Sequence, residues 1–158
     1  MNKAVFFLLA IAASLFVLSE ATRVQSCSGE RGLKESDSIV ISGCNNPPCK
    51  LKKKTKINVE FKFVPDSDVS KLENSVFAYV LGLPVPFVGV DSTSACDNIH
   101  EEESGKSGCP LKAGTKYTYK NSFDVLEVYP KIRTTVQWAL REPNGKDHVC
   151  FKVDSRIV

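Results

Sequence analysis

The sequence has few histidines and none of the motifs from which most enzyme active sites are built. It holds two histidines, His100 in an acidic stretch and His148 after a turn at the start of an expected strand. No Gly-x-Ser-x-Gly segment, phosphate-binding loop or dinucleotide-binding fingerprint accompanies them. Carboxylate pairs such as Asp66 and Asp68 stand in turn segments, where aspartate is common for conformational reasons. Nothing in the sequence therefore supports an enzyme or a bound cofactor.

Long apolar runs are also scarce, since the only one lies at the beginning of the chain. Lys3 precedes the run Ala4–Leu18, and the small residues of Ser19-Glu20-Ala21 follow it. This order is typical of a secretory signal peptide, and the run is short for a transmembrane helix. We predict a signal peptide over residues 1–21 and one mature domain over residues 22–158, long enough to bury a core.

Neither sign of charge dominates the composition. The formal net charge is +3, and removal of residues 1–21 leaves it unchanged because Lys3 and Glu20 leave together. So small a charge does not argue for nucleic acid. One local cluster of lysines has two explanations that are about equally good. It could form a solvated strand edge whose charges discourage pairing with another strand, or a surface that binds an anionic partner. It consists of Lys50, Lys52, Lys53, Lys54 and Lys56.

Six cysteines follow the predicted signal peptide: Cys27, Cys44, Cys49, Cys96, Cys109 and Cys150. An even number in a secreted chain indicates three disulfides. The spacing favours Cys44–Cys49 around two prolines and Cys96–Cys109 around a polar, glycine-containing segment, which leaves Cys27 for Cys150. A zinc site is the alternative interpretation, but the spacings do not match a ligand pattern.

The mature sequence has no long segment of helical periodicity, and apolar and polar residues alternate instead. Alternation predicts strands with one wet and one buried face. It is strongest over residues 57–63, 132–141 and 149–154, and further candidates are 38–42, 76–81 and 117–125. Several antiparallel strands joined by short turns, without a helix, predict an all-β sandwich of two sheets.

Two segments between the expected strands read as surface loops. Gly82–Val88 is almost wholly apolar, and Pro84 and Pro86 exclude a central strand or a helix interior. We expect an extended, poorly hydrogen-bonded loop that exposes Leu83, Val85 and Phe87 and either plugs the core or forms the mouth of a pocket. The second segment, 97–108, should be a mobile acidic loop, with calcium binding by its glutamates as the less favoured alternative.

Several short motifs together resemble one family. The sequence is similar to the Niemann-Pick type C2 branch of the ML (MD-2-related lipid-recognition) proteins from Cys27 to about Ile157, and its long Cys96–Cys109 segment resembles the arthropod members. The motifs are Ser42-Gly-Cys-Asn-Asn-Pro-Pro-Cys-Lys-Leu51, Ile57-Asn-Val-Glu-Phe61, Gly82-Leu-Pro-Val-Pro-Phe87, Cys109-Pro110, Tyr117-Thr-Tyr119, Val128-Tyr-Pro-Lys-Ile132, Val136-Gln-Trp138 and Val149-Cys-Phe151. The resemblance implies an immunoglobulin-like sandwich with a lipid between two antiparallel sheets, and the same three disulfides.

The resemblance also implies the residues that bind the lipid. Those matching the family's gate at the pocket mouth are Phe87, Val125 and Tyr129. Those matching further lining positions are Leu51, Ile57, Val59, Val85, Val136, Trp138 and Phe151. We expect Phe87 to be partly buried and to face Tyr129 and Val125, with both aromatic residues at strand ends.

The function that follows is a secreted carrier of a small apolar ligand, such as a sterol, fatty acid or semiochemical-like lipid, with transient membrane or receptor contact. It needs no cofactor, because transfer requires only reversible burial. The alternative is an innate-immune recognition protein that docks on a receptor or a microbial lipid. The sequence has no Asn-x-Ser/Thr sequon, and this favours secretion over glycan-dependent sorting to lysosomes.

Overall fold

The computed structural model describes residues 20–27 and 38–158, so the predicted signal peptide lies almost wholly outside the described residues. The elements are β1 (Gln25–Ser26), β2 (Ile39–Ile41), β3 (Cys49–Leu51), β4 (Lys56–Phe63), β5 (Glu73–Val80), β6 (Leu83–Pro86), η1 (Cys96–Asn98), β7 (Ile99–Glu101), β8 (Tyr117–Asp124), β9 (Arg133–Arg141) and β10 (Asp147–Ile157). The six predicted strands correspond to β2, β4, β5, β8, β9 and β10, within a few residues at each end.

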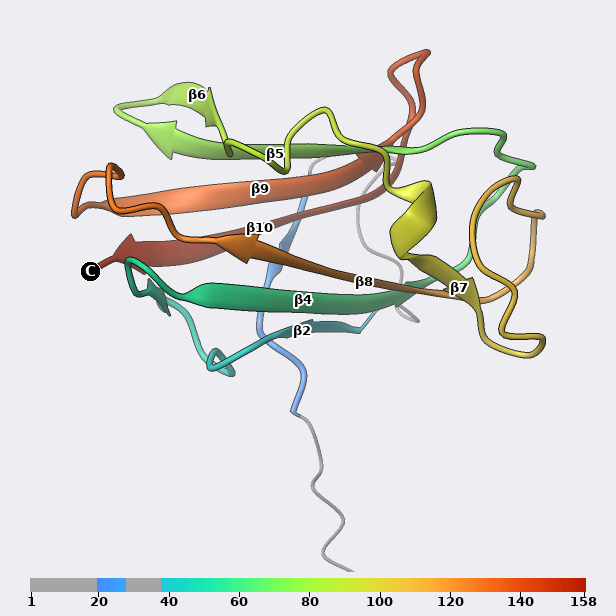
Figure 1. The fold of residues 1–158 in the computed structure, drawn as a ribbon, viewed down its shortest axis with the longest axis horizontal. Coiled ribbons are helices and arrows are strands. Elements are labelled where there is room, and N and C mark those ends of the chain that lie inside the picture. Colours follow the sequence, from blue (N-terminus) through green and yellow to red (C-terminus); the bar gives the residue numbers. More distant parts are fainter. Residues whose placement is uncertain (1–19, 28–37) are drawn as a thin grey trace, which may run out of the picture.

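The strands form two sheets that lie face to face (Figure 1). The larger sheet has the order β1-β10-β9-β5-β6, with β3 also paired to β10, and the smaller has the order β2-β4-β8-β7. All neighbouring strands are antiparallel except β3 and β10, which run parallel. The predicted immunoglobulin-like β-sandwich is therefore confirmed, with one parallel pair added.

The core lies between the sheets because alternation places one face of each strand there. In β4 the side chains of Ile57, Val59, Phe61 and Phe63 are buried, whereas those between them are exposed or half-buried. The Phe61 ring stacks on Tyr119 of its own sheet at a centroid distance of 4.6 Å and meets the edge of Phe151 in the other sheet at 5.8 Å.

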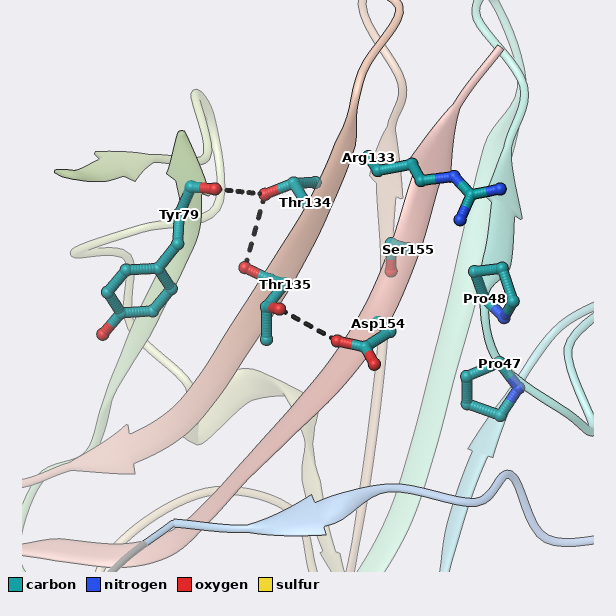
Figure 2. Close-up of a pocket in the computed structure, with 8 residues that line it drawn as sticks. All are labelled: Pro47, Pro48, Tyr79, Arg133, Thr134, Thr135, Asp154 and Ser155. Atoms are coloured by element: carbon teal, nitrogen blue, oxygen red, sulfur yellow. Dashed lines mark hydrogen bonds between the residues drawn. The ribbon is translucent and has the colours of Figure 1, made fainter. Parts of the chain in front are cut away.

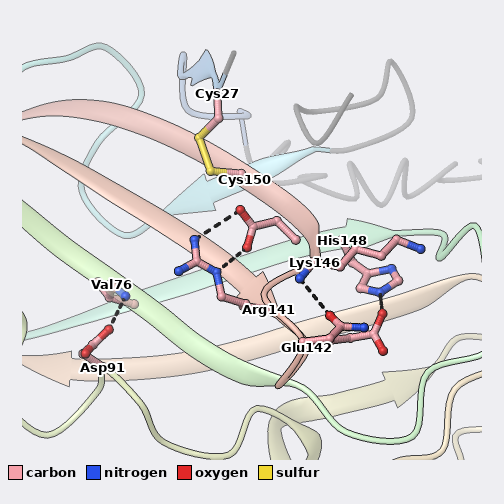
Figure 3. Close-up of polar contacts among 10 residues, drawn as sticks. Cys27, Val76, Asp91, Arg141, Glu142, Lys146, His148 and Cys150 are labelled. Carbon is pink, nitrogen blue, oxygen red and sulfur yellow. Dashed lines mark hydrogen bonds and ion pairs between the residues drawn. A yellow bond between two sulfur atoms is a disulfide. The ribbon is translucent and has the colours of Figure 1, made fainter. Parts of the chain in front are cut away.

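Three disulfides join the cysteines that the spacing paired. Cys27, just after β1, is bonded to Cys150 in β10 across 123 residues, and Figure 3 shows this bond. The shorter loops are Cys44–Cys49 and Cys96–Cys109. Every cysteine is in a disulfide, so no thiolate remains to bind a metal.

The two segments expected to be loops are more regular than predicted. Leu83–Pro86 is edge strand β6, paired with β5 from Phe77 to Val80, so the prediction of a poorly hydrogen-bonded loop is wrong. It remains compatible with its prolines because an edge strand has one unpaired side. Likewise, the segment 97–108 contains most of η1 and all of β7, which pairs with β8.

The acidic segment is tied to the smaller sheet through Glu102. Its carboxylate lies 2.6 Å from the Lys62 ammonium and 3.6 Å from that of Lys116, and it accepts a hydrogen bond from the Thr118 hydroxyl at 2.8 Å. The hydrogen bonds from Lys62 and Thr118 hold the pKa of Glu102 below its ordinary value. The carboxylate is therefore already paired with protein cations.

Candidate functional site

An apolar groove of about 50 Å³ lies at one end of the sandwich. The β5–β6 hairpin, the loop before β9 and the end of β10 meet there, at the left of Figure 1. The lining residues are Ala78, Val80, Val85, Pro86, Phe87, Tyr129, Pro130, Ile132 and Ile157. We call this space the mouth groove.

A second space of about 20 Å³ lies deeper between the sheets. Both sheets contribute to its lining, which consists of Ile41, Cys49, Leu51, Val59, Phe123, Val136, Trp138, Phe151, Val153 and Ser155. We call this space the inner cavity. No charged side chain is among the described residues that line either space. Both are therefore suited to apolar groups.

A chain of aromatic contacts runs from the mouth groove to the interior. The rings of Tyr129 and Phe87 meet at a centroid distance of 5.6 Å, Phe87 and Phe123 at 5.3 Å, and Phe123 and Trp138 at 5.9 Å. Trp138 then meets Tyr119 at 6.2 Å. Contacts of this kind contribute about 0.5–1.5 kcal/mol each beyond burial. The aromatic chain is thus cohesive, yet each contact is weak enough to be broken by a competing apolar ligand.

Backbone hydrogen bonds hold Phe87 in place at the mouth. Its N–H donates to the Val76 carbonyl at 2.9 Å, and its own carbonyl accepts from the Asp91 N–H at 3.0 Å. The Asp91 carboxylate accepts in turn from the Val76 N–H at 2.8 Å (Figure 3). The Tyr129 hydroxyl accepts from the Val88 N–H at 3.2 Å, which joins the two loops of the mouth.

A buried polar cluster stands behind the aromatic chain. The Tyr119 hydroxyl donates to the Asn74 side-chain oxygen at 2.6 Å and accepts from the Asn121 amide at 2.8 Å. Burial raises the pKa of Tyr119, so its hydroxyl stays protonated and neutral at physiological pH. The indole N–H of Trp138 lies near this hydroxyl but makes no hydrogen bond of acceptable geometry to it. The interior is therefore uncharged throughout this region.

Most of the residues expected at the pocket do line one of the two spaces. Three line the mouth groove: Val85, Phe87 and Tyr129. Five line the inner cavity: Leu51, Val59, Val136, Trp138 and Phe151. Ile57 and Val125 are buried, but line neither space.

Two details of the expected gate are wrong. Phe87 is only 4% exposed, because its ring packs between Tyr129 and Phe123. Leu83 and Val85, in contrast, are exposed as expected. Tyr129 lies in a turn several residues after β8 rather than at a strand end. The expected contact between Phe87 and Tyr129 is present.

Sequence reasoning also missed Phe123, which belongs to the inner cavity and touches Phe87. Its signal was available: Phe123 stands two residues before Val125 in a predicted strand, and alternation places both on one face. The aliphatic residues that β5 and β10 contribute to the mouth groove are Ala78, Val80 and Ile157, and they carried no such signal. Their position at the groove depends on the pairing of strands that are far apart in the sequence.

Exposed apolar side chains surround the mouth. Leu81, between β5 and β6, is 98% exposed, and Val128, in the loop before β9, is 83% exposed. Leu83, Val85 and Val88 are also exposed. These five are the large apolar side chains that are exposed among residues 20–27 and 38–158. Their clustering at one end indicates a contact surface rather than scattered exposure.

A separate hollow of about 410 Å³ lies on the outer side of the larger sheet (Figure 2). Its lining is mostly polar, with Arg133, Thr135 and Asp154 beside Pro47 and Pro48. The Thr135 hydroxyl donates to the Asp154 carboxylate at 2.9 Å. With this lining it does not match the apolar pocket that the sequence predicts.

The fold and the apolar space between its sheets define a known class of domain. A profile of the ML-domain family matches residues 21–157, and the chain belongs to this family. It is 32% identical over 145 residues to the ecdysteroid-regulated 16 kDa protein of Manduca sexta, covering 90% of this chain and 93% of that protein. It is 28% identical over 154 residues to NPC intracellular cholesterol transporter 2 of Bos taurus, covering 96% and 94%.

A solved structure agrees with these relatives. The Niemann-Pick type C2 protein from the Japanese carpenter ant superimposes with a TM-score of 0.67 at 26% identity, covering 86% of this chain and 99% of that chain. The chain is therefore a Niemann-Pick type C2-like member of the ML family, of arthropod type. Within the described part of the chain, no helix has the length and apolar character needed to cross a membrane.

Proposed function

We propose that this protein is a secreted lipid-binding and transfer protein that holds a sterol, a fatty acid or a similar small apolar molecule between its two sheets. The observation that carries the proposal is the pair of uncharged apolar spaces, the mouth groove and the inner cavity, which are separated by the contact between Phe87 and Phe123. Several similar proteins are named as intracellular cholesterol transporters, which supports the same class of ligand. The protein acts by reversible burial, as a binding protein rather than an enzyme, and needs no cofactor.

Binding requires the sandwich to open. The two spaces measure about 50 and 20 Å³. Pockets for small molecules are usually about 300–1,000 Å³. A lipid must therefore push the aromatic chain apart and separate the facing side chains of β8 and β9. Apolar area removed from water drives this opening at roughly 25 cal/mol per Å².

We also propose that the exposed apolar side chains beside the mouth groove contact a lipid surface during transfer. Leu81 and Val128 project beside the mouth and line neither space, so they are free to contact a bilayer while the ligand passes. Leu81→Ser should slow transfer between vesicles and leave equilibrium affinity unchanged, with exposed Ala113→Ser as the control. Equal transfer rates for wild type and Leu81→Ser would exclude this role.

The same exposed apolar side chains are also compatible with the alternative function, an innate-immune recognition protein that docks on a receptor. The two functions differ in ligand exchange, since a carrier must release its lipid and a recognition protein must keep a stable protein partner. Rapid exchange of a labelled fatty acid between protein and vesicles favours the carrier. A stable receptor complex without exchange favours recognition.

Native mass spectrometry of the full chain, secreted from eukaryotic cells, tests the main proposal. We expect a mature protein that begins near residue 22, with a mass excess of one small molecule that organic extraction releases and identifies. Extracted protein should then rebind a fatty acid or a sterol. Protein that carries no lipid and rebinds neither probe would contradict the proposal, and protein retained in the cells would contradict its secretion.

A further inference from the structure

The mouth groove and the inner cavity have no lining residue in common. Two strand pairs form the sides of the boundary, because each places one member in each lining set. Ala78 in the groove pairs with Val136 in the cavity, and Ile157 in the groove pairs with Leu51 in the cavity. These four residues are held by the hydrogen-bonded ladders of β3, β5, β9 and β10, so they form a fixed frame.

The middle of the boundary is a single side-chain contact. Phe87 lines the groove and Phe123 lines the cavity, and their rings meet edge to face at 5.3 Å with an interplanar angle of 76°. On its other side Phe123 meets the Trp138 indole at 5.9 Å. The ring of Phe123 therefore stands between the groove and the cavity wall, and a ligand that reaches Trp138 must displace it.

We propose that Phe123 is the inner gate of the lipid pocket: its ring blocks the way from the mouth groove to the inner cavity and determines which lipids enter. This inference rests on the proposed function and names the ligand class that the inner gate admits more readily. That class is a single flexible acyl chain, in preference to a rigid fused-ring sterol. An acyl chain advances one methylene group at a time and bends around a partly rotated ring. A fused-ring body presents its whole width at once, so it must displace Phe123 together with the fixed frame.

The position of Phe123 in the fold suits a gate residue whose side chain can rotate aside. It is the penultimate residue of β8, and the strand ends at Asp124. Its ring meets Phe87 edge to face and Trp138 at a tilted angle of 48°, and aromatic pairs accept offset-stacked as well as edge-to-face arrangements. Phe123 is paired with Ile57 of β4 in the β4–β8 ladder, and Phe87 has its N–H and carbonyl bonded to neighbouring backbone, so the backbone is held at both positions. Opening of the boundary must therefore come from rotation of the Phe123 side chain.

The test compares two probes, palmitic acid and cholesterol, on folded full-length protein by competition against a fluorescent fatty acid. The variants are Phe123→Leu, which preserves most of the packing, and Phe123→Ala, which removes the ring. The matched control is Phe63→Leu, because Phe63 is a buried phenylalanine of β4 that lines neither space. Circular dichroism and thermal melting select the variants that remain folded.

We expect the wild type to bind palmitic acid more tightly than cholesterol. Both Phe123 variants should shift this ratio toward cholesterol, by roughly tenfold for Phe123→Ala. Phe63→Leu should leave the ratio unchanged. An unchanged ratio in folded Phe123→Leu and Phe123→Ala, or an equal shift in Phe63→Leu, overturns the inference while the proposed function stands. If the wild type binds neither probe, the proposed function fails, and the inference fails with it.

Discussion

Truncation of Phe87 to alanine is expected to affect both stability and binding. The side chain is 4% exposed and contacts both Tyr129 and Phe123. Removing a buried phenylalanine ring costs about 3–5 kcal/mol of unfolding free energy. The mouth groove beside it allows some collapse of the site, so we expect a loss near the lower limit, roughly 3 kcal/mol. For a domain of this size that corresponds to a fall in Tm of about 10 °C.

Lipid affinity should fall as well, because Phe87 supplies part of the apolar surface at the mouth. A loss of about 1.4 kcal/mol in apolar contact weakens binding tenfold. The assay measures thermal unfolding and fatty-acid affinity on the same preparation and expresses affinity per folded molecule. Phe87→Leu is the matched control, since it keeps an apolar side chain of similar volume and should cost less than about 1.5 kcal/mol.

Two outcomes would refute this reasoning in different ways. An unchanged Tm would show that the burial of Phe87 does not stabilise the fold. A lower Tm with unchanged affinity and unchanged dissociation rate would make Phe87 a plug of the core with no role in binding.

Three further predictions test other parts of the structure. Cys27→Ser combined with Cys150→Ser opens a loop with a sequence separation of 123 residues and should cost roughly 4–5 kcal/mol, and a double variant that melts like wild type would contradict this. The fluorescence of Trp138 should shift or be quenched when a fatty acid binds, because its indole lines the inner cavity, and an indifferent signal at saturating ligand would place it in a dry core. The hydrogen bonds from Lys62 and Thr118 hold the pKa of Glu102 below its ordinary value, so its contribution to stability is present at neutral pH and is lost as the pH falls through this lowered pKa. Glu102→Gln should therefore lower Tm at about pH 7 but not at about pH 2, whereas the exposed neighbour Glu103→Gln should change neither.

The main strands could be read from the sequence because local alternation decides which face of a strand is buried. β4 shows this directly, since its predicted inward residues are the buried ones. The disulfide pairs followed from spacing, as Cys44 and Cys49 flank two prolines that turn the chain. The short strands β1, β3 and β7 gave too few residues for alternation to appear, so pairing with distant strands determines them.

The segment Gly82–Val88 shows the limit of this kind of reading. Its prolines correctly excluded a central strand, and its exposed leucine and valine were expected. The burial of Phe87 was not, because it depends on two aromatic rings that stand 36 and 42 residues further along the chain. Proline restricts the backbone that bears a side chain, but it does not determine which distant surface that side chain meets.

The sequence by itself determined the class of fold, the strands with clear alternation, the pairing of the cysteines and the family. These properties follow from local periodicity, spacing and short motifs. Only the tertiary structure decided that the apolar space is divided in two, that Phe123 stands at the division and that Ile57 and Val125 line neither part. The physical reason is that a cavity is the small volume left over when two sheets pack, and this remainder depends on contacts between strands far apart in the chain.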